Sequence, residues 1–365
     1  MTFLRCLRCV MPNTRPDTPF VDGVCAACLS FERRPTIDWK ARHEELISLI
    51  GRHAGRCIVP SSGGKDSTYQ VMTLLELGAH PLIVTASTCH LTEIGRHNID
   101  NLSRYAPTIE VTPNRTVRAK LNRLGLEMVG DISWPEHAGI FSTPFKIAGA
   151  TGTALMFYGE NPQDQYGGPL GTEDAREMTR RWTTEFGGFL GLRPNDFVGV
   201  EGITGLDMSM YQFPSGSEMD DIGIEAHFLG QYIEWDSERN ARVAMDAGMK
   251  VGTPSDANWW PAENLDNAQT GIHDWFGYLK YGYGRACAQV SVDVRHGRMS
   301  RDQALKLVQF RDGNFPMVYG DVPIEEVLHH IRMNREHFIE VANEYLNRDL
   351  FDGDVEWGER PRLKS

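Results

Sequence analysis

Short apolar runs alternate with longer amphipathic segments up to about residue 160. Four runs of strand length, each bounded by turn-forming residues, lie at residues 57–60, 81–85, 109–111 and 154–158. Segments with apolar side chains at helical spacing lie before or between them, at residues 39–53, 68–77, 95–105 and 144–149. Strands that alternate with helices in this way predict an α/β fold with a doubly wound parallel sheet.

The pattern changes beyond residue 160. Residues 161–275 are dense in glycine, proline and tryptophan and show little periodicity, but they are too aromatic for a disordered linker. Further on, Ser300 and Gln303 form a capping box, and Pro323 opens a helix that we expect to run to about Tyr345. These features predict an ordered insertion followed by a helical C-terminal region.

The segment between the first apolar run and its following helix reads Ser-Ser-Gly-Gly-Lys-Asp-Ser, at residues 61–67. A glycine pair lets backbone N–H groups approach an anion closely. The helix N-terminus adds partial positive charge, and Lys65 adds a full one. The Walker A pattern is absent. We therefore predict a phosphate-binding loop of another type, the alternative being an ordinary strand–turn–helix corner.

Two Cys-x-x-Cys pairs near the N-terminus predict a metal site. In a reducing compartment this spacing is typical of structural zinc, because two short turns can each offer two thiolates to a tetrahedral ion. Disulfides or inert thiols are the alternative. The predicted ligands are Cys6, Cys9, Cys25 and Cys28. The other three cysteines, at positions 57, 89 and 287, have no partner visible in the sequence.

These observations divide the chain into four parts. We expect a zinc ribbon at residues 1–35 and the α/β core at residues 36–165. A Gly- and Trp-rich insertion or substrate lid should follow at residues 166–275. The helical region at residues 276–365 should complete the active site.

The charge balance narrows the class of protein. The 365-residue chain has a formal net charge of -12, which is not the footprint of a nucleic-acid-binding protein. No stretch has the apolar length of a membrane span, and the N-terminus lacks the apolar core of a signal peptide. We therefore expect a cytoplasmic protein without a membrane span, in which thiols stay reduced.

Other polar residues are candidates for the same site. Glu160 and Asn161 follow the run at 154–158, so they should lie at the same sheet edge as the glycine loop, the alternative being a helix or turn cap. Lys280 and Arg285 flank glycines and suit a pyrophosphate clamp, or else are solvated surface charges. Asn98, in the helix after the second strand, is a weaker candidate of the same kind.

The string from Ser62 to Ser67 resembles the SGGxDS signature of the PP-loop ATP pyrophosphatases, whose fold is the adenine nucleotide α-hydrolase-like sheet. This resemblance implies that ATP is split between its α and β phosphates, that a substrate oxygen is adenylated, and that a nucleophile displaces AMP. It assigns Lys65 to the β,γ-phosphates, with Mg²⁺ spreading the charge. Asp66 is a magnesium ligand or a helix-start residue. The remaining loop residues expected at ATP are Ser61, Ser62, Gly63, Gly64 and Ser67.

A wider set of segments resembles the N-acetyl sugar amidotransferase family of lipopolysaccharide and nonulosonic-acid biosynthesis. The segments are the cysteine ribbon, the glycine loop, and residues 94–98, 144–148, 159–168, 280–285 and 295–301. The resemblance implies that ATP and ammonia convert the acetamido group of an amino sugar, in our reading nucleotide-linked, into an acetamidino group. We expect Glu160 and Asn161 at the reacting end.

The resemblance also implies partners. It points to glutaminase and cyclase-like subunits that deliver ammonia, and the chain itself lacks a nucleophile-elbow pattern around its isolated cysteines. Two other functions are open on the residues alone. A PP-loop enzyme that thiolates or amidinates a tRNA base would need a basic surface. The other alternative is a non-catalytic zinc-ribbon scaffold whose loop only senses ATP, and the intact Gly-Gly-Lys-Asp-Ser string argues against it.

Overall fold

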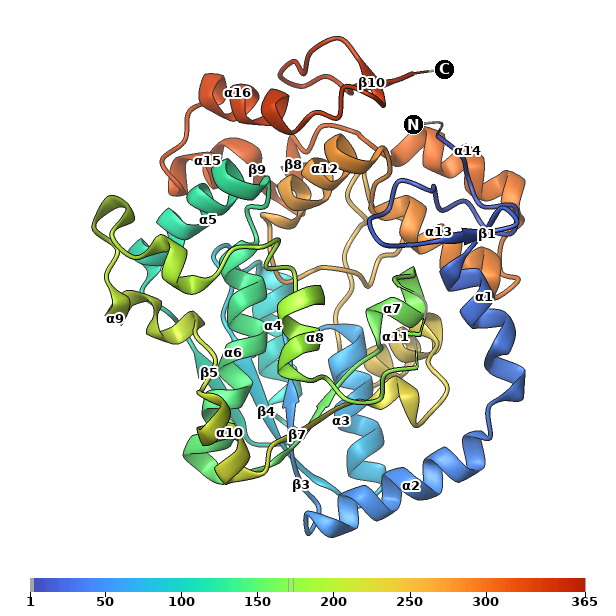
Figure 1. The fold of residues 1–365 in the computed structure, drawn as a ribbon, viewed down its shortest axis with the longest axis vertical. Coiled ribbons are helices and arrows are strands. Elements are labelled where there is room, and N and C mark those ends of the chain that lie inside the picture. The colour runs from blue at the N-terminus through green and yellow to red at the C-terminus, as the bar shows by residue number, and fades with distance from the viewer. Residues whose placement is uncertain (1–2, 170, 173, 365) are drawn as a thin grey trace.

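The computed structural model describes residues 3–169, 171–172 and 174–364, and a parallel five-stranded sheet lies at its centre (Figure 1). The strand order is β5-β4-β3-β6-β7. The strands are β3 (Arg56–Pro60), β4 (His80–Ala86), β5 (Thr108–Val111), β6 (Leu155–Tyr158) and β7 (Glu225–Phe228). All four predicted strands are confirmed. The fifth, β7, lies in the segment where the periodicity predicted none.

Alternating side chains of the central strands enter two different cores. Val59, Ile83 and Phe157 pack with helices α2 (Trp39–Arg52) and α3 (Lys65–Glu76). Their neighbours along the same strands, including Ile58 and Met156, pack with α6 (Trp134–Thr151) and α8 (Arg180–Phe186). Because side chains in a strand point alternately to opposite faces, helices cover both faces of the sheet. The prediction of a doubly wound α/β sheet is confirmed.

The helices around this sheet differ from the sequence expectation in two places. Helix α4 (Glu93–Leu102) lies close to its predicted bounds, but α5 (Arg115–Val129) was not predicted at all. The expected helix at 144–149 is the last part of α6, with Pro144 in its interior. A proline inside a helix removes one backbone hydrogen bond, and for this reason the sequence predicted that a helix starts at Pro144. In the structure the helix continues through Pro144, and its packing against β4 stabilises it.

The segment after β6 is ordered and forms short elements. Its helices are α7 (Pro162–Tyr166), α8, α9 (Gly205–Met208), α10 (Gly216–Ile222) and α11 (Ser237–Asp246), with short 3₁₀ turns between them. Phe197, Met208 and Tyr211 are buried in a cluster against α5 and α6, while α11 packs along α3. The segment therefore surrounds the sheet on more than one side.

The last third of the chain is helical. Its elements are α12 (Thr270–Tyr281), α13 (Arg285–Arg295), α14 (Arg301–Arg311), α15 (Ile324–His330) and α16 (Arg335–Tyr345), with hairpins β8 (Val318–Tyr319)–β9 (Val322–Pro323) and β10 (Phe351–Asp352)–β11 (Arg362–Leu363). The capping box of Ser300 and Gln303 is confirmed. The single helix expected up to Tyr345 is two helices, because Arg332 has a φ of 60° and breaks the helical path.

The N-terminal residues dock on these helices. Strands β1 (Phe20–Val21) and β2 (Val24–Cys25) precede α1 (Ala26–Arg33), and this blue segment lies against α13 and α14 in Figure 1. Val10 and Met11 share a buried cluster with Val290 of α13 and Val308 of α14. No helix in the described ranges is long and apolar enough to cross a membrane. The four-part division of the chain stays a prediction.

Candidate active site

A cavity of ≈ 360 Å³ lies where the strand order reverses, between β3 and β6. In an open parallel sheet, the loops that leave two such strands diverge to opposite faces and leave a crevice, which is the usual ligand site. The glycine loop follows β3 and lines this cavity, together with Asn98 and Glu160. Residues 262–266, from the segment before α12, line it as well.

The glycine loop packs tightly at the start of α3. Gly63 has a φ of 79°, and a Cβ on it would lie 2.7 Å from the backbone nitrogen of Ile99 in α4. A side chain at this position would therefore clash as well as strain the backbone. The hydroxyl of Ser61 accepts a hydrogen bond from the Gly63 N–H at 2.9 Å and donates one to the Ser67 hydroxyl at 2.8 Å. These contacts hold the loop in one conformation.

Lys65 is a buried cation enclosed by carboxylates. Its side chain is 5% exposed, and its Nζ lies 2.5 Å from Asp66 Oδ2 and 2.8 Å from Glu263 Oε2. Burial alone would lower the pKa of Lys65, but the charges of Asp66 and Glu263 outweigh it and hold that pKa well above its usual range. The ring of Trp260 lies 5.7 Å from the same nitrogen. Lys65 is therefore charged and stands where an anion can replace its carboxylate partners.

Glu160 has an unusual protonation equilibrium. Burial, and then the negative charge of Asp66, raise the pKa of Glu160 to about 7. A carboxyl group with this pKa exists in both forms at neutral pH, so it can accept or donate a proton. Asn161 differs, because its Oδ1 accepts the Gln163 N–H at 3.0 Å and its Nδ2 donates to the Thr172 carbonyl at 2.8 Å. In this structure Asn161 is the N-cap of α7.

The other predicted cations are separated from each other. Arg285 makes a bidentate pair with Asp274, and the nearby charge of Glu263 helps to raise the pKa of Arg285 against the effect of burial. Arg285 therefore lies beside the group that surrounds Lys65.

Lys280 lies elsewhere, contrary to expectation. Its Nζ donates to the carbonyls of Val129 and Gly130, at 3.4 and 3.0 Å. Gly282, in the left-handed region, reverses the chain after α12, so Lys280 and Arg285 belong to different helices and face different neighbours. The side chain of Asn98 is also occupied, since it pairs with the backbone N–H and C=O of Lys250 at 2.8 and 2.9 Å.

The sequence did not predict several residues that lie in the cavity or next to it. Glu263 pairs with Lys65, and Asn240 of α11 donates to Asp66 Oδ1 at 3.0 Å. Asp266 lines the cavity, and burial raises its pKa to about 6. A Cβ on Gly95 would lie 2.6 Å from the Cα of Asp266, so this segment rests directly on α4. Glu263 and Asp266 lie in a stretch without helical or strand periodicity. Their negative charge, opposite to that of Lys65, was the only feature of the sequence that could have indicated this contact.

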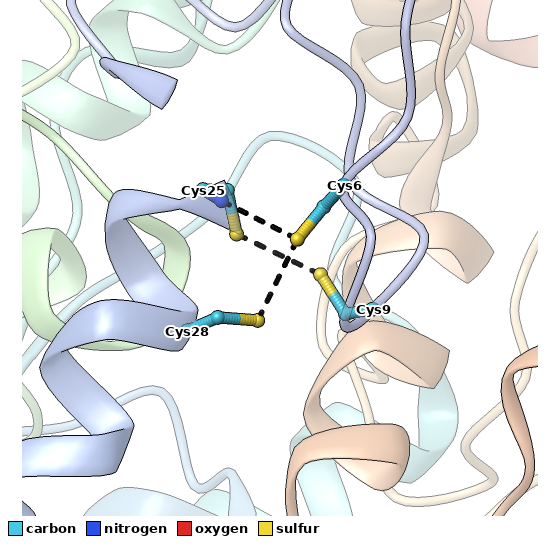
Figure 2. A group of neighbouring side chains, drawn as sticks. All are labelled: Cys6, Cys9, Cys25 and Cys28. Carbon is cyan, nitrogen blue, oxygen red and sulfur yellow. Dashed lines mark hydrogen bonds between the residues drawn. The ribbon is translucent and has the colours of Figure 1, made fainter. Parts of the chain in front are cut away.

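The four N-terminal cysteines form a compact buried group (Figure 2). Sγ–Sγ distances are 3.9 Å between Cys6 and Cys28 and 3.7 Å between Cys9 and Cys25. A disulfide would need about 2.05 Å. Sulfurs at the corners of a tetrahedron around Zn²⁺, with Zn–S bonds of about 2.3 Å, would be about 3.8 Å apart. The sulfurs therefore fit a tetrahedral metal ion, with the backbone N–H of Cys25 donating to Cys6 Sγ at 3.3 Å.

The cysteine group is connected to the cavity through α7, which follows Glu160. Asp164 of α7 accepts hydrogen bonds from Ser30 and from Arg34, the latter at 2.9 Å. Arg295 of α13, next to the cysteines, donates to the Gln165 carbonyl at 2.6 Å. The N-terminal residues therefore fix the helix that begins just after Glu160.

Comparison with known proteins gives a match to a protein family and a similarity to a solved structure. Residues 257–363 match the family described as LPS biosynthesis protein WbpG-like, C-terminal domain. Among solved structures, an NMN synthetase from Francisella tularensis is similar at 11% identity and a TM-score of 0.27, over 60% of this chain and 99% of that chain. That superposition is too loose to support an argument. No curated protein matches the chain.

Proposed function

We propose that this chain, whose residues 257–363 carry the C-terminal domain of the WbpG-like lipopolysaccharide-biosynthesis proteins, is an ATP-dependent, AMP-forming sugar amidotransferase of the PP-loop type. The observation that carries the proposal is Lys65. It lies at the end of a glycine loop at the switch point of the sheet, charged and facing a cavity that also contains Glu160. The acceptor is the acetamido group of an N-acetylated, nucleotide-linked sugar.

The proposed chemistry has two steps. The amide oxygen of the acetamido group attacks the α-phosphorus of ATP, and the bond to the β-phosphate oxygen breaks to release pyrophosphate. Ammonia then adds to the activated carbon, the C–O bond to AMP breaks, and an acetamidino group remains. The first step is needed because the amide nitrogen donates into the carbonyl and makes it a poor electrophile. Water must be excluded, since it would hydrolyse the same activated carbon.

The loop residues have distinct roles in this proposal. Lys65 exchanges Asp66 and Glu263 for the β,γ-phosphates and stabilises the charge that develops on the departing pyrophosphate. The carboxylates of Asp66 and Glu263 around this point are the oxygen ligands that Mg²⁺ prefers, so the residues fit that ion. Mg²⁺, when bound, neutralises phosphate charge.

Glu160 is proposed to act on the second step. The nitrogen that attacks the activated carbon must lose a proton, and a carboxylate with a pKa of about 7 accepts it without being too weak a base at neutral pH. Trp182 and Phe141 line the cavity and Trp260 lies beside Lys65, and we propose that these rings limit the access of water. The four cysteines are proposed to hold a structural Zn²⁺, because four thiolates leave no open position on the ion.

Ammonia is proposed to come from partner subunits. Glutamine hydrolysis would need a nucleophilic thiolate. Burial raises the pKa of the Cys57 and Cys89 thiols to about 12, and it also raises the pKa of Cys287. The other four cysteines are in the metal-site group. The same thiols argue against a tRNA-thiolating enzyme, which would need a reactive cysteine near the loop.

Product identity tests the proposal. The purified chain is incubated with ATP, an N-acetylated nucleotide-sugar and high ammonium, and the nucleotide products are separated. AMP and pyrophosphate in equal amounts, with an acetamidino sugar, are expected. ADP and phosphate would refute the PP-loop mechanism, and turnover of tRNA in place of the sugar would refute the substrate class. Glutamine should not replace ammonium for the isolated chain, and glutamine-dependent turnover would refute the need for partners.

A further inference from the structure

A second group of metal-ligating side chains lies away from the ATP cavity and from the cysteines. Asp131 is in the turn between α5 and α6, His137 is in the first turn of α6, and His273 is in the first turn of α12. Ligand atoms of the three residues all lie within 4.8 Å of one another. Three separate elements therefore bring one carboxylate and two imidazoles to a single point.

The distances within this group suit a bound cation. Asp131 Oδ1 lies 2.7 Å from His273 Nδ1, and Asp131 Oδ2 lies 3.3 Å from His137 Nδ1. Ligand atoms about 2.05 Å from a zinc-type ion would be about 2.9 Å apart in octahedral and about 3.4 Å apart in tetrahedral coordination. The separation of 3.3 Å lies within this range, whereas the 2.7 Å separation, which is a hydrogen bond in this structure, lies slightly below it.

The ring nitrogen Nδ1 of His137 differs from that of His273, which pairs with Asp131 at 2.7 Å. His137 Nδ1 is buried and has no hydrogen-bond partner among the described residues, although Asp131 is near enough for an ion pair. A Cβ on Gly188 would lie 2.7 Å from that nitrogen, and Gly188 has a φ of 77°. The Gly188 backbone therefore packs closely beside His137 and has to be glycine there. Asp131 is the nearest ionic partner of His137 Nδ1, so a metal ion between these two groups would bind both.

The charges around the group favour a cation on balance. The Asp131 side chain is only 4% exposed, and Glu136 adds a second negative charge near His137. Lys280 opposes them, but its ammonium group is held by the carbonyls of Val129 and Gly130. A buried carboxylate is costly unless a positive charge offsets it, and here either protonated His137 and His273 or a metal ion would supply that charge.

The other described triad, Cys89, His90 and His330, is a poorer candidate. Arg118 lies beside it, and burial together with the charges of His330 and Arg118 lowers the pKa of His90 to about 4. The positive surroundings that disfavour protonation of His90 would equally disfavour a metal cation.

We propose that Asp131, His137 and His273 bind a divalent transition-metal ion of the zinc class. Two imidazoles and one carboxylate are a donor set that such ions accept, and the partial exposure of both histidines, 26% and 29%, gives the ion a route in and leaves room for water as a further ligand. His273 lies in the stretch that matches the WbpG-like C-terminal domain, so the ion would join that domain to the α/β core.

Cobalt titration of the full-length protein tests the proposal. With the four-cysteine site filled by Zn²⁺, one further equivalent of Co²⁺ should bind and give visible d–d absorption without a thiolate charge-transfer band. The variants Asp131→Asn and His273→Ala should weaken this binding at least about tenfold, the scale on which even an outer ligand changes metal affinity. His329→Ala, an exposed histidine outside the group, should bind as the wild type.

Three results would overturn the proposal. They are the absence of a second equivalent in the wild type, a thiolate band in the cobalt spectrum, and unchanged binding in both variants. In the wild type, Asp131 Oδ1 accepts the Ser133 N–H at 2.8 Å, and the asparagine of Asp131→Asn keeps an oxygen that can accept the same hydrogen bond. Circular dichroism reports whether each variant is folded. If both variants were unfolded, the wild-type stoichiometry and spectrum would still decide between the outcomes.

Discussion

Replacing Glu160 with glutamine should stabilise the protein at alkaline pH while removing its activity. The reason is the cost of an ionised carboxylate in the cavity, where burial and the charge of Asp66 raise the pKa of Glu160 from 4.5 to about 7. The folded state therefore holds this proton more tightly than the unfolded state. Stability from Glu160 is fully present below pH 4.5, falls as pH rises through this interval, and is constant above about pH 7.

The size of the effect follows from that interval. At 1.36 kcal/mol per pH unit, the difference between 4.5 and about 7 corresponds to about 3 kcal/mol. A neutral glutamine at this position has no ionisation to lose. Relative to the wild type, Glu160→Gln should therefore gain up to about 3 kcal/mol of unfolding free energy at pH 8 and less than about 1 kcal/mol at pH 5.

Urea unfolding at both pH values, without nucleotide, measures this difference. Glu359→Gln, which removes an exposed carboxylate, is the matched control and should show no such pH dependence. A Glu160→Gln effect that is the same at pH 5 and pH 8 would refute the electrostatic argument. In the same proteins, acetamidino product at fixed free ammonia should rise with pH through about 7 in the wild type and be lost in the variant.

Three further predictions follow from the site. Lys65→Ala should lower pyrophosphate formation by at least about 10²-fold with an unchanged circular dichroism spectrum, the scale of one lost electrostatic donor, and normal turnover would remove Lys65 from the mechanism. Cys25→Ser should lose the zinc detected by elemental analysis together with thermal stability, whereas Cys57→Ala should keep its zinc; retention in both would contradict the four-thiolate site. Arg285→Lys should raise the KM for ATP, while Lys280→Gln should leave it within about twofold, because only Arg285 lies beside Glu263; the opposite ranking would contradict the placement seen here.

The sheet was predictable from the sequence because its strands are buried on both faces. Runs such as Cys57 to Pro60 are almost wholly apolar and short, and the glycine loop marks the end of the first one. Helix α5 was missed for the opposite reason. It mixes charged and apolar residues around most of its surface, and its signals are the Asn114 cap and Gly130 at its end. The ends of a helix could be predicted from the sequence only where a capping residue lies next to a clear stripe of apolar residues.

The cavity was only partly predictable, because its residues come from segments far apart in the chain. Lys65 and Glu160 follow strands, and the topology of a parallel sheet brings such positions together. Glu263 lies almost 200 residues from Lys65 in a stretch without period, so only the fold reveals their contact. Lys280 and Arg285 looked equivalent in sequence, yet the left-handed turn at Gly282 sends them to different neighbours.

The carboxylates that surround Lys65 are consistent with a site that has not yet bound its proposed substrate. A buried ion pair contributes little net stability, because desolvation offsets most of its Coulomb energy. In the proposed mechanism, the contacts of Lys65 with Asp66 and Glu263 would therefore be exchanged for contacts with phosphate at small cost. The released carboxylates would then be free to hold a cation such as Mg²⁺, and that ion would neutralise phosphate charge. In this proposal the same carboxylates neutralise Lys65 before ATP arrives and hold the cation afterwards. Glu263 lies in the segment that rests on α4 at Gly95, so this exchange would take place at a wall of the cavity that packing holds in position.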